Sequence, residues 1–259
     1  MPKLAANLTL MFNEVPFPER FGAAAKAGFK GVEYLFPYEF PKEQLAEQLQ
    51  KHHLRQVLFD FPAGNWAGGD RGIAVDPKRT GEFQDGVGKA LDYAETLNCK
   101  LLTVLAGKAP ADLAEDKAMH TLIENTRFAA RKSAPLGITV LVEALNSRDV
   151  PGFFLLKTAK SRAVIGEVAE SNARLQYDVY HMQIMEGDLA TTIKANFGTI
   201  GHFQLADNPG RNEPGTGEIN YDFLLPFIDG LGYNGWVGCE YRPKGKTIDG
   251  LGWARKWMA

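Results

Sequence analysis

The chain has 259 residues, of which 45% are hydrophobic and 23% charged, and this composition excludes a largely disordered protein. No apolar stretch approaches the length needed to cross a bilayer, so we expect no membrane partner. Lys and Arg number 29 against 31 Asp and Glu, a formal net charge of -2, and without any dense basic run this argues against nucleic acid as a partner.

Short apolar segments alternate along the chain with longer segments of helical period. This alternation is typical of parallel strands joined by crossover helices. Eight such strands in a chain of this length predict an α/β protein, a (β/α)8 TIM barrel that forms a single domain over residues 1–259. We expect the strands at residues 4–10, 31–36, 55–60, 101–106, 139–144, 174–180, 201–206 and 236–241, and the helices at residues 18–27, 42–52, 81–97, 111–134, 158–170, 189–197, 221–231 and, as a short last one, 252–257.

Glycines and one long loop mark the connections between these elements. Gly28, Gly137, Gly198 and Gly232 follow four of the predicted helices, where a left-handed residue is favoured. The longest irregular connection, residues 62–78, is rich in Gly and follows the third strand. Since the site of a barrel of this type lies at the C-terminal ends of its strands, we expect this loop to overhang it.

Oxygen-bearing side chains stand late in four consecutive strands. Glu143 ends strand five, Asp178 lies in strand six, Gln204 lies late in strand seven, and Glu240 lies at the end of strand eight. A single carboxylate at a strand end is often a helix N-cap or a solvated charge. Four such side chains at the same end of a barrel instead favour a metal site, with Glu143, Asp178, Gln204 and Glu240 as its ligands.

The residue types of this set indicate which ion it holds. Carboxylates buried close together raise each other's pKa, and a divalent cation removes most of that cost. An all-oxygen ligand set suits Mg²⁺ or Mn²⁺ far better than Zn²⁺ held by Cys or His. We therefore expect a divalent metal cofactor, with Mg²⁺ first and Mn²⁺ as the alternative.

Two further side chains are candidates for substrate binding. His181 follows Asp178 by three residues and is placed to donate a hydrogen bond to a substrate oxygen that becomes negative, although a loop histidine bonded to backbone is the plainer interpretation. Arg211, in the loop after strand seven, can pair with a substrate carboxylate or hydroxyl, or be a solvated loop charge.

The only cysteines are Cys99 and Cys239, as is usual for a protein of a reducing compartment. The first residues lack the long apolar core and cleavage site of a signal peptide. We therefore expect two free thiols and a cytoplasmic location.

Six short motifs, in order along the whole chain, resemble the hydroxypyruvate isomerase and 2-oxo-tetronate isomerase family of xylose-isomerase-like barrels. They are LAANLTLMF at 4–12, EYLFPY at 33–38, VEALN at 142–146, HFQLA at 202–206, GEINY at 217–221 and GCEY at 238–241. The resemblance implies that Glu143 and Glu240 alternate as proton acceptor and donor, and that both hold the metal with Asp178 and Gln204. Ketose epimerases of the wider group usually carry a histidine at the position of Gln204, so here a carbonyl oxygen replaces a nitrogen ligand, which favours Mg²⁺.

The chemistry suits the residues apart from any resemblance. A proton next to a carbonyl becomes removable when a cation stabilises the enediolate, and two carboxylates can then move it between adjacent carbons. We therefore expect an intramolecular oxidoreductase of the aldose-ketose type. It would convert hydroxypyruvate to tartronate semialdehyde, or a 2-oxo-tetronate to a 3-oxo-tetronate. One-sided and two-sided proton transfer both stay open.

Other functions also fit parts of the sequence. A ketose 3-epimerase of the same superfamily is the nearest alternative, and a sugar-binding barrel without turnover is another. An abasic-site endonuclease of this superfamily needs several metals and a basic surface, and five histidines are too few for it. The substrate is a small hydroxy-carbonyl acid or sugar in the preferred interpretations, and a homo-oligomer is compatible with the sequence.

Overall fold

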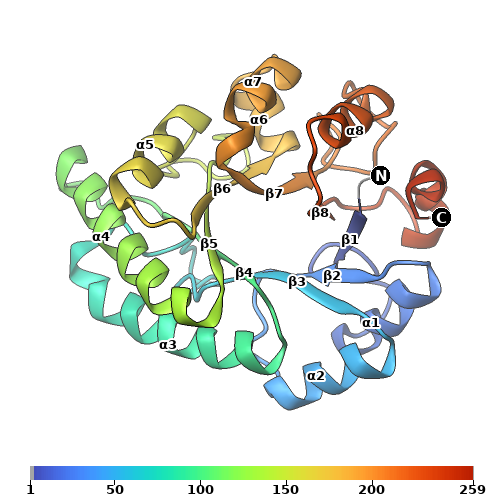
Figure 1. Cartoon of the computed structure of the whole chain (residues 1–259), viewed down its shortest axis with the longest axis horizontal. Coiled ribbons are helices and arrows are strands. Elements are labelled where there is room, and N and C mark those ends of the chain that lie inside the picture. Colours follow the sequence, from blue (N-terminus) through green and yellow to red (C-terminus); the bar gives the residue numbers. More distant parts are fainter. Residues whose placement is uncertain (1–2, 259) are drawn as a thin grey trace.

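The computed structural model describes residues 3–258, which form a closed barrel of eight parallel strands surrounded by helices (Figure 1). The strands pair in chain order, and β8 closes the ring on β1. This arrangement confirms the predicted fold class. The strands are β1 Lys3–Asn7, β2 Gly31–Glu33, β3 Arg55–Asp60, β4 Leu101–Val104, β5 Thr139–Glu143, β6 Ala173–Asp178, β7 Ile200–Leu205 and β8 Trp236–Cys239.

The helices cover the outside of the barrel because each presents an apolar side to it. In α2, for example, the buried residues Leu45 and Leu49 lie one turn apart and face the strands. The helices are α1 Phe17–Lys26, α2 Lys42–Lys51, α3 Thr80–Thr96, α4 Glu115–Ser133, α5 Thr158–Val168, α6 Val179–Met185, α7 Leu189–Asn196 and α8 Tyr221–Gly230, with the 3-10 helices η1 Pro77–Arg79, η2 Ala134–Leu136, η3 Phe197–Thr199 and η4 Thr247–Trp257.

Strand six and the segment after it differ from the prediction. The strand ends at Asp178, and the next residues form α6, which was not predicted. The cause is local, because the Asp178 carboxylate accepts a hydrogen bond from the backbone N–H of Tyr180 at 2.8 Å and so caps the new helix. The apolar residues of α6 continue the pattern of the strand, which is why the sequence did not separate the two elements.

Three of the four glycines expected after helices have the left-handed backbone, namely Gly28, Gly137 and Gly232 with φ of 104°, 62° and 90°. The prediction for Gly198 was wrong, because this residue lies within η3 and its φ is not positive. Cys99 and Cys239 are free, as predicted, and both are buried. Over residues 3–258, no helix has both the length and the apolar character that crossing a membrane requires.

Candidate active site

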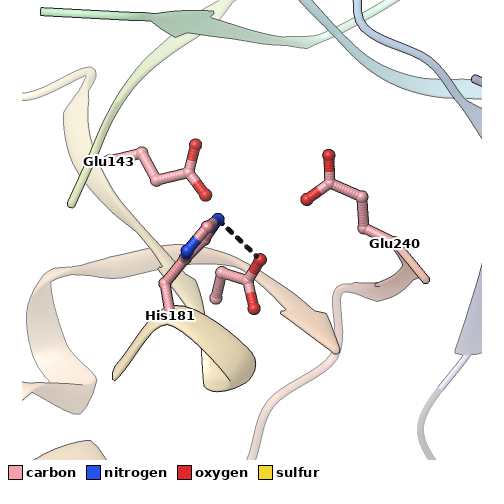
Figure 2. Close-up of side chains that lie close together, drawn as sticks. Glu143, His181 and Glu240 are labelled. Carbon is pink, nitrogen blue, oxygen red and sulfur yellow. Dashed lines mark ion pairs between the residues drawn. The ribbon is translucent and has the colours of Figure 1, made fainter. Parts of the chain in front are cut away.

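Three carboxylates meet at the C-terminal end of the barrel. Figure 2 shows Glu143 and Glu240 pointing toward one another from opposite sides, with His181 below Glu143. Glu143 ends β5, Asp178 ends β6, and Glu240 directly follows β8. Glu143, Asp178, His181 and Glu240 each have one ligand atom that lies within 4.8 Å of those of the other three. The sequence-predicted side chains of strands five, six and eight are therefore brought together.

These carboxylates are buried, and burial raises their pKa values. Burial raises the pKa of Glu143 well above its ordinary value, and the charges of Glu240 and Asp178 add to the effect. Burial also raises the pKa of Glu240 to about 8, although Arg211 acts in the opposite direction. Burial likewise raises the pKa of Asp178, and again Arg211 opposes it. Without a further positive charge, burial therefore disfavours the charged state of this cluster.

The cluster has the donor atoms that a cation needs. Glu143 Oε1 and Asp178 Oδ2 are buried and have no hydrogen-bond partner among the described residues. A buried carboxylate oxygen without a donor is costly, and a divalent ion satisfies several such oxygens at once. The residues present therefore fit a divalent metal.

His181 is held as a neutral ring with a defined tautomer. Its Nδ1 accepts a hydrogen bond from the backbone N–H of Asn146 at 3.1 Å, and the Asn146 amide lies 2.7 Å from the same nitrogen. A backbone N–H can only donate, so the ring proton is on Nε2. Burial lowers the pKa of His181 well below its ordinary value, and Arg211 adds to the shift. Nε2 lies 3.6 Å from Asp178 Oδ2 on the side of the carboxylates, so it presents a hydrogen-bond donor to the site (Figure 2).

Gln204 lies beside the cluster, paired in register with Asp178. Its Nε2 donates to Glu33 Oε1 at 2.7 Å, and its Oε1 accepts from Gln176 Nε2 at 2.6 Å. These two bonds fix the orientation of the amide. The carbonyl oxygen has a second lone pair, so its predicted place among the metal ligands stays a prediction.

A buried carboxylate supports Gln204 from inside the barrel. Glu33 is fully buried, and it also accepts a hydrogen bond from Asn7 at 3.1 Å and lies 2.9 Å from His202 Nε2. Room for it comes from Gly238, where a Cβ would lie 2.2 Å from Glu33 Oε1. The sequence did not predict this group of buried polar side chains, because its members lie on four different strands. They are Asn7, Glu33, Gln176, His202 and Gln204.

Arg211 faces the acidic cluster. Its Nη2 lies 2.9 Å from Glu240 Oε2 and 3.9 Å from Asp178 Oδ2, and its Nη1 lies 3.4 Å from Asp149. Although burial acts to lower it, these carboxylates raise the pKa of Arg211. The guanidinium charge is thus already offset by the protein's own acids.

The carboxylates open into a cavity of about 240 Å³. The long loop after β3, residues 61–76, overhangs it as predicted, and its Trp66 and Arg71 line the space. Asp60, Asp149 and Arg242 also line it, and with Arg71 they are the charged lining residues that were not predicted from the sequence. Asp60 ends the predicted third strand, so the rule that found Glu143 could have found it. Burial raises the pKa of Asp60 well above its ordinary value, with Glu240 and Glu33 adding to it.

The end of this loop is fastened to the segment after β4. Gly72 and Ala106 form an antiparallel bridge, and the Val75 N–H donates to the Ala106 carbonyl at 3.0 Å. Gly72 and Gly107 both have positive φ, of 110° and 92°, and a Cβ on either would come within 2.2 Å of the other segment's backbone. Only glycine permits so close a crossing.

Known proteins share this barrel over almost its whole length. A family model described as xylose isomerase-like TIM barrel matches residues 21–257. A 2-oxo-tetronate isomerase from Cupriavidus necator is 45% identical over 258 residues, covering 100% of this chain and 99% of that protein. The hydroxypyruvate isomerase of Escherichia coli K12 is 47% identical over 253 residues, covering 98% of each.

Solved structures of other proteins have the same fold. The structure named as an AP endonuclease, family 2, from Brucella melitensis has a TM-score of 0.97 and 48% identity, covering 99% of each chain. A 3-keto-D-glucoside 4-epimerase from E. coli has a TM-score of 0.82 at 21% identity over 99% of each chain, a level that shows the fold alone. From the full-length relatives, this chain belongs to the hydroxypyruvate isomerase and 2-oxo-tetronate isomerase family of xylose isomerase-like TIM barrels, whose curated members are isomerase enzymes.

Proposed function

We propose that the protein interconverts hydroxy-carbonyl acids by proton transfer through an enediolate, with Glu143 and Glu240 as the proton donor and acceptor. The observation that carries this proposal is the convergence of the two glutamates, with Asp178 between their strands, on one small cavity. The relatives' names suggest hydroxypyruvate, which would become tartronate semialdehyde, or a 2-oxo-tetronate, which would become a 3-oxo-tetronate.

The proton transfer uses the two buried glutamates, Glu143 and Glu240, as base and acid. One carboxylate takes a proton from the carbon that carries the hydroxyl group, and the other gives a proton to the former carbonyl carbon, so the two glutamates exchange protonation states. The proton of the hydroxyl group passes to the former carbonyl oxygen, and the carbonyl group thereby moves to the neighbouring carbon. The neutral His181 donates from Nε2 to the substrate oxygen that becomes negative.

The metal in this proposal is Mg²⁺, with Mn²⁺ as the alternative, held by Glu143, Asp178, Gln204 and Glu240. When bound, a divalent cation polarises the substrate carbonyl and stabilises the negative charge of the enediolate. The all-oxygen character of the predicted ligands favours these ions. His181 is left out of this set because its ring proton is on Nε2, the nitrogen that faces the cluster.

An endonuclease function is less well supported, although one solved relative carries that name. The acidic cluster contains one histidine among the described residues, and the chain has a net charge of -2. A surface for the phosphate backbone needs an excess of positive charge. The ketose 3-epimerase alternative shares the site chemistry, so an assay must separate it.

The test is proton NMR in deuterated buffer with hydroxypyruvate, 2-oxo-tetronates and short ketoses, with and without Mg²⁺. An isomerase moves the carbonyl to the neighbouring carbon and incorporates solvent deuterium, whereas a 3-epimerase keeps the ketone in place. We expect isomerisation of an acid, because the curated relatives act on acids by name.

The same assay tests the two glutamates. Glu143→Gln and Glu240→Gln should each abolish deuterium incorporation, since each removes one of the two proton-transferring groups. Glu47→Gln is the matched control, because Glu47 is exposed on α2, remote from the site. Deuterium exchange that persists in either site variant at the wild-type rate removes that residue from the mechanism.

A further inference from the structure

Arg71 has no assigned role, although it lines the cavity from the loop after β3. It is half-buried, and among residues 3–258 no carboxylate forms an ion pair with it. Its nearest acidic neighbour in the chain, Asp70, is already used, because Asp70 Oδ2 accepts from Arg79 at 2.8 Å and from the Asn65 N–H at 2.7 Å. The Arg71 charge is therefore unpaired at the edge of the cavity.

The guanidinium is nevertheless held in place. It lies 4.3 Å from the ring centroid of Trp66, a cation–π contact, and Trp66 in turn packs edge-on against Phe36 at 5.0 Å. Its Nη1 donates to the backbone carbonyls of Trp66 at 3.0 Å and Asp70 at 2.6 Å. These bonds occupy one nitrogen, so Nε and Nη2 keep N–H groups for a ligand. The fixed backbone of Gly72 follows immediately.

The cavity poses an electrostatic problem for an acid. Glu143, Glu240 and Asp60 line it, so an anionic substrate meets negative charge on entry. A divalent cation and Arg211 offset the charge of the inner cluster, and Arg211 is already within 4.0 Å of three carboxylates. A substrate carboxylate therefore needs a positive charge of its own, outside this cluster.

We infer that Arg71 binds the carboxylate of the substrate and thereby selects hydroxy-carbonyl acids over neutral ketoses of the same size. This inference rests on the proposed function, since it assigns the acid group of that substrate to a site on the loop. The reacting carbons then lie toward Glu143 and Glu240, and the carboxylate lies toward the loop. Arg242 is the competing candidate, because it also lines the cavity, but it is exposed.

The test compares hydroxypyruvate with dihydroxyacetone, in which a CH₂OH group replaces the carboxylate. Arg71→Gln should raise the KM for hydroxypyruvate about 10- to 100-fold, the range for loss of a hydrogen bond between charged partners. In the same variant, the rate of deuterium exchange into dihydroxyacetone should change by less than about threefold. Arg71→Lys should raise the KM less than Arg71→Gln does, because lysine keeps the positive charge but not the planar pair of donors. Arg148→Gln is the matched control, since Arg148 is exposed and outside the cavity lining.

Distinct results overturn the inference. If Arg71→Gln weakens the reaction of hydroxypyruvate and of dihydroxyacetone equally, Arg71 only holds the loop. If Arg242→Gln raises the KM for hydroxypyruvate and Arg71→Gln does not, Arg242 binds the carboxylate instead. If turnover of dihydroxyacetone is too slow to measure, the inference is tested by the KM for hydroxypyruvate alone. A raised KM in Arg71→Gln that is partly restored in Arg71→Lys supports it, and an unchanged KM in Arg71→Gln refutes it. If wild-type protein shows no turnover, the proposed function fails by itself. Calorimetric titration with hydroxypyruvate then still decides on Arg71, with weaker binding to Arg71→Gln supporting it and equal binding refuting it.

Discussion

Single side chains at this site take their chemistry from the contacts behind them. His181 is the clearest case, because the backbone N–H of Asn146 determines which ring nitrogen carries the proton. Burial then lowers the pKa of His181 well below its ordinary value, so the ring stays neutral across the working range of pH. In the proposed mechanism, this neutral ring would stabilise the developing oxyanion by donating a hydrogen bond from Nε2.

Replacement of His181 by phenylalanine should therefore lower kcat by about 100-fold with little change in KM, since the lost hydrogen bond matters most when the oxygen is negative. The measurement is steady-state kinetics on the preferred acid. His120→Phe on α4 is the control, because His120 is exposed and outside the cavity lining. A rise in KM at unchanged kcat would instead assign His181 to ground-state binding.

Residue positions at strand ends could be predicted, but residue contacts across the barrel could not. Glu143, Asp178 and Glu240 follow from one rule about where barrels place their sites. The partners of Gln204 are different, since Glu33 lies 171 positions away in the chain. Arg71 gave no signal, because a loop charge acquires its surroundings only when the loop is folded.

At the scale of elements, the strands were easier to predict than their ends. All eight strands lie where the apolar segments are, yet β1 ends at Asn7 and β2 at Glu33, earlier than predicted. The chain turns there although its residues remain apolar, and the Asn7 side chain accepts from the Thr9 N–H at 3.1 Å to form the turn. Hydrophobic periodicity identifies an element but does not detect the bond that ends it.

Hydrogen bonds join the loop after β1 to the start of η4. The Glu14 carboxylate, in the loop after β1, accepts hydrogen bonds from the backbone N–H and the hydroxyl group of Thr247 at the start of η4. The Thr247 hydroxyl also accepts from the Phe12 N–H at 2.8 Å. Burial acts to raise the pKa of Glu14, but these bonds outweigh it and lower the pKa below its ordinary value.

Glu14→Gln should lower Tm by about 2 °C at pH 7, because a solvent-exposed charged acceptor is worth roughly 0.5–1 kcal/mol. A lowered folded-state pKa contributes stability above the unfolded value, and this stability disappears as pH falls through the folded value. The difference in Tm from wild type should therefore shrink as pH falls below the ordinary value of 4.5. Thermal melts from pH 7 to pH 3.5 measure it, and a difference that stays constant with pH contradicts the assigned role.

For the whole molecule, the barrel gathers four buried carboxyl groups at the C-terminal end of its strands. The chain as a whole is almost neutral, with a net charge of -2, yet Asp60, Glu143, Asp178 and Glu240 are all buried at that end. Their shared burial raises each pKa, so the fold itself opposes the charged state of its site. A cation bound by this cluster, as we propose, would reverse the effect and stabilise the folded protein.

Removal of divalent metal by chelation should therefore lower both turnover and Tm. In metal-free protein, a carboxyl group with a raised pKa contributes stability below its unfolded value, and this stability is lost as pH rises through the folded value, about 8 for Glu240. The increase in Tm on adding Mg²⁺ should thus grow from pH 5.5 to pH 8.5. It should reach about 5–10 °C at a concentration 100 times Kd.

The measurement is a thermal melt of chelator-treated protein with and without Mg²⁺ or Mn²⁺, with metal content determined on the same sample. Glu143→Gln provides the matched protein, in which the added ion should stabilise less. Full turnover and an unchanged Tm in protein shown to be metal-free would disprove the requirement for a cation.

The glycine crossing between Gly72 and Gly107 also divides the loop after β3 into two parts with different tolerance for insertions. Residues 72–75 are bonded to the neighbouring segment, so an added residue there would shift every bond that follows. The tip at residues 67–69 is exposed, and an added Cβ at Gly69 would meet no atom within 4 Å, although the φ of 103° there favours glycine. Changes in loop length, whether from evolution or from engineering, can accumulate at the tip while the carboxylates below keep their arrangement.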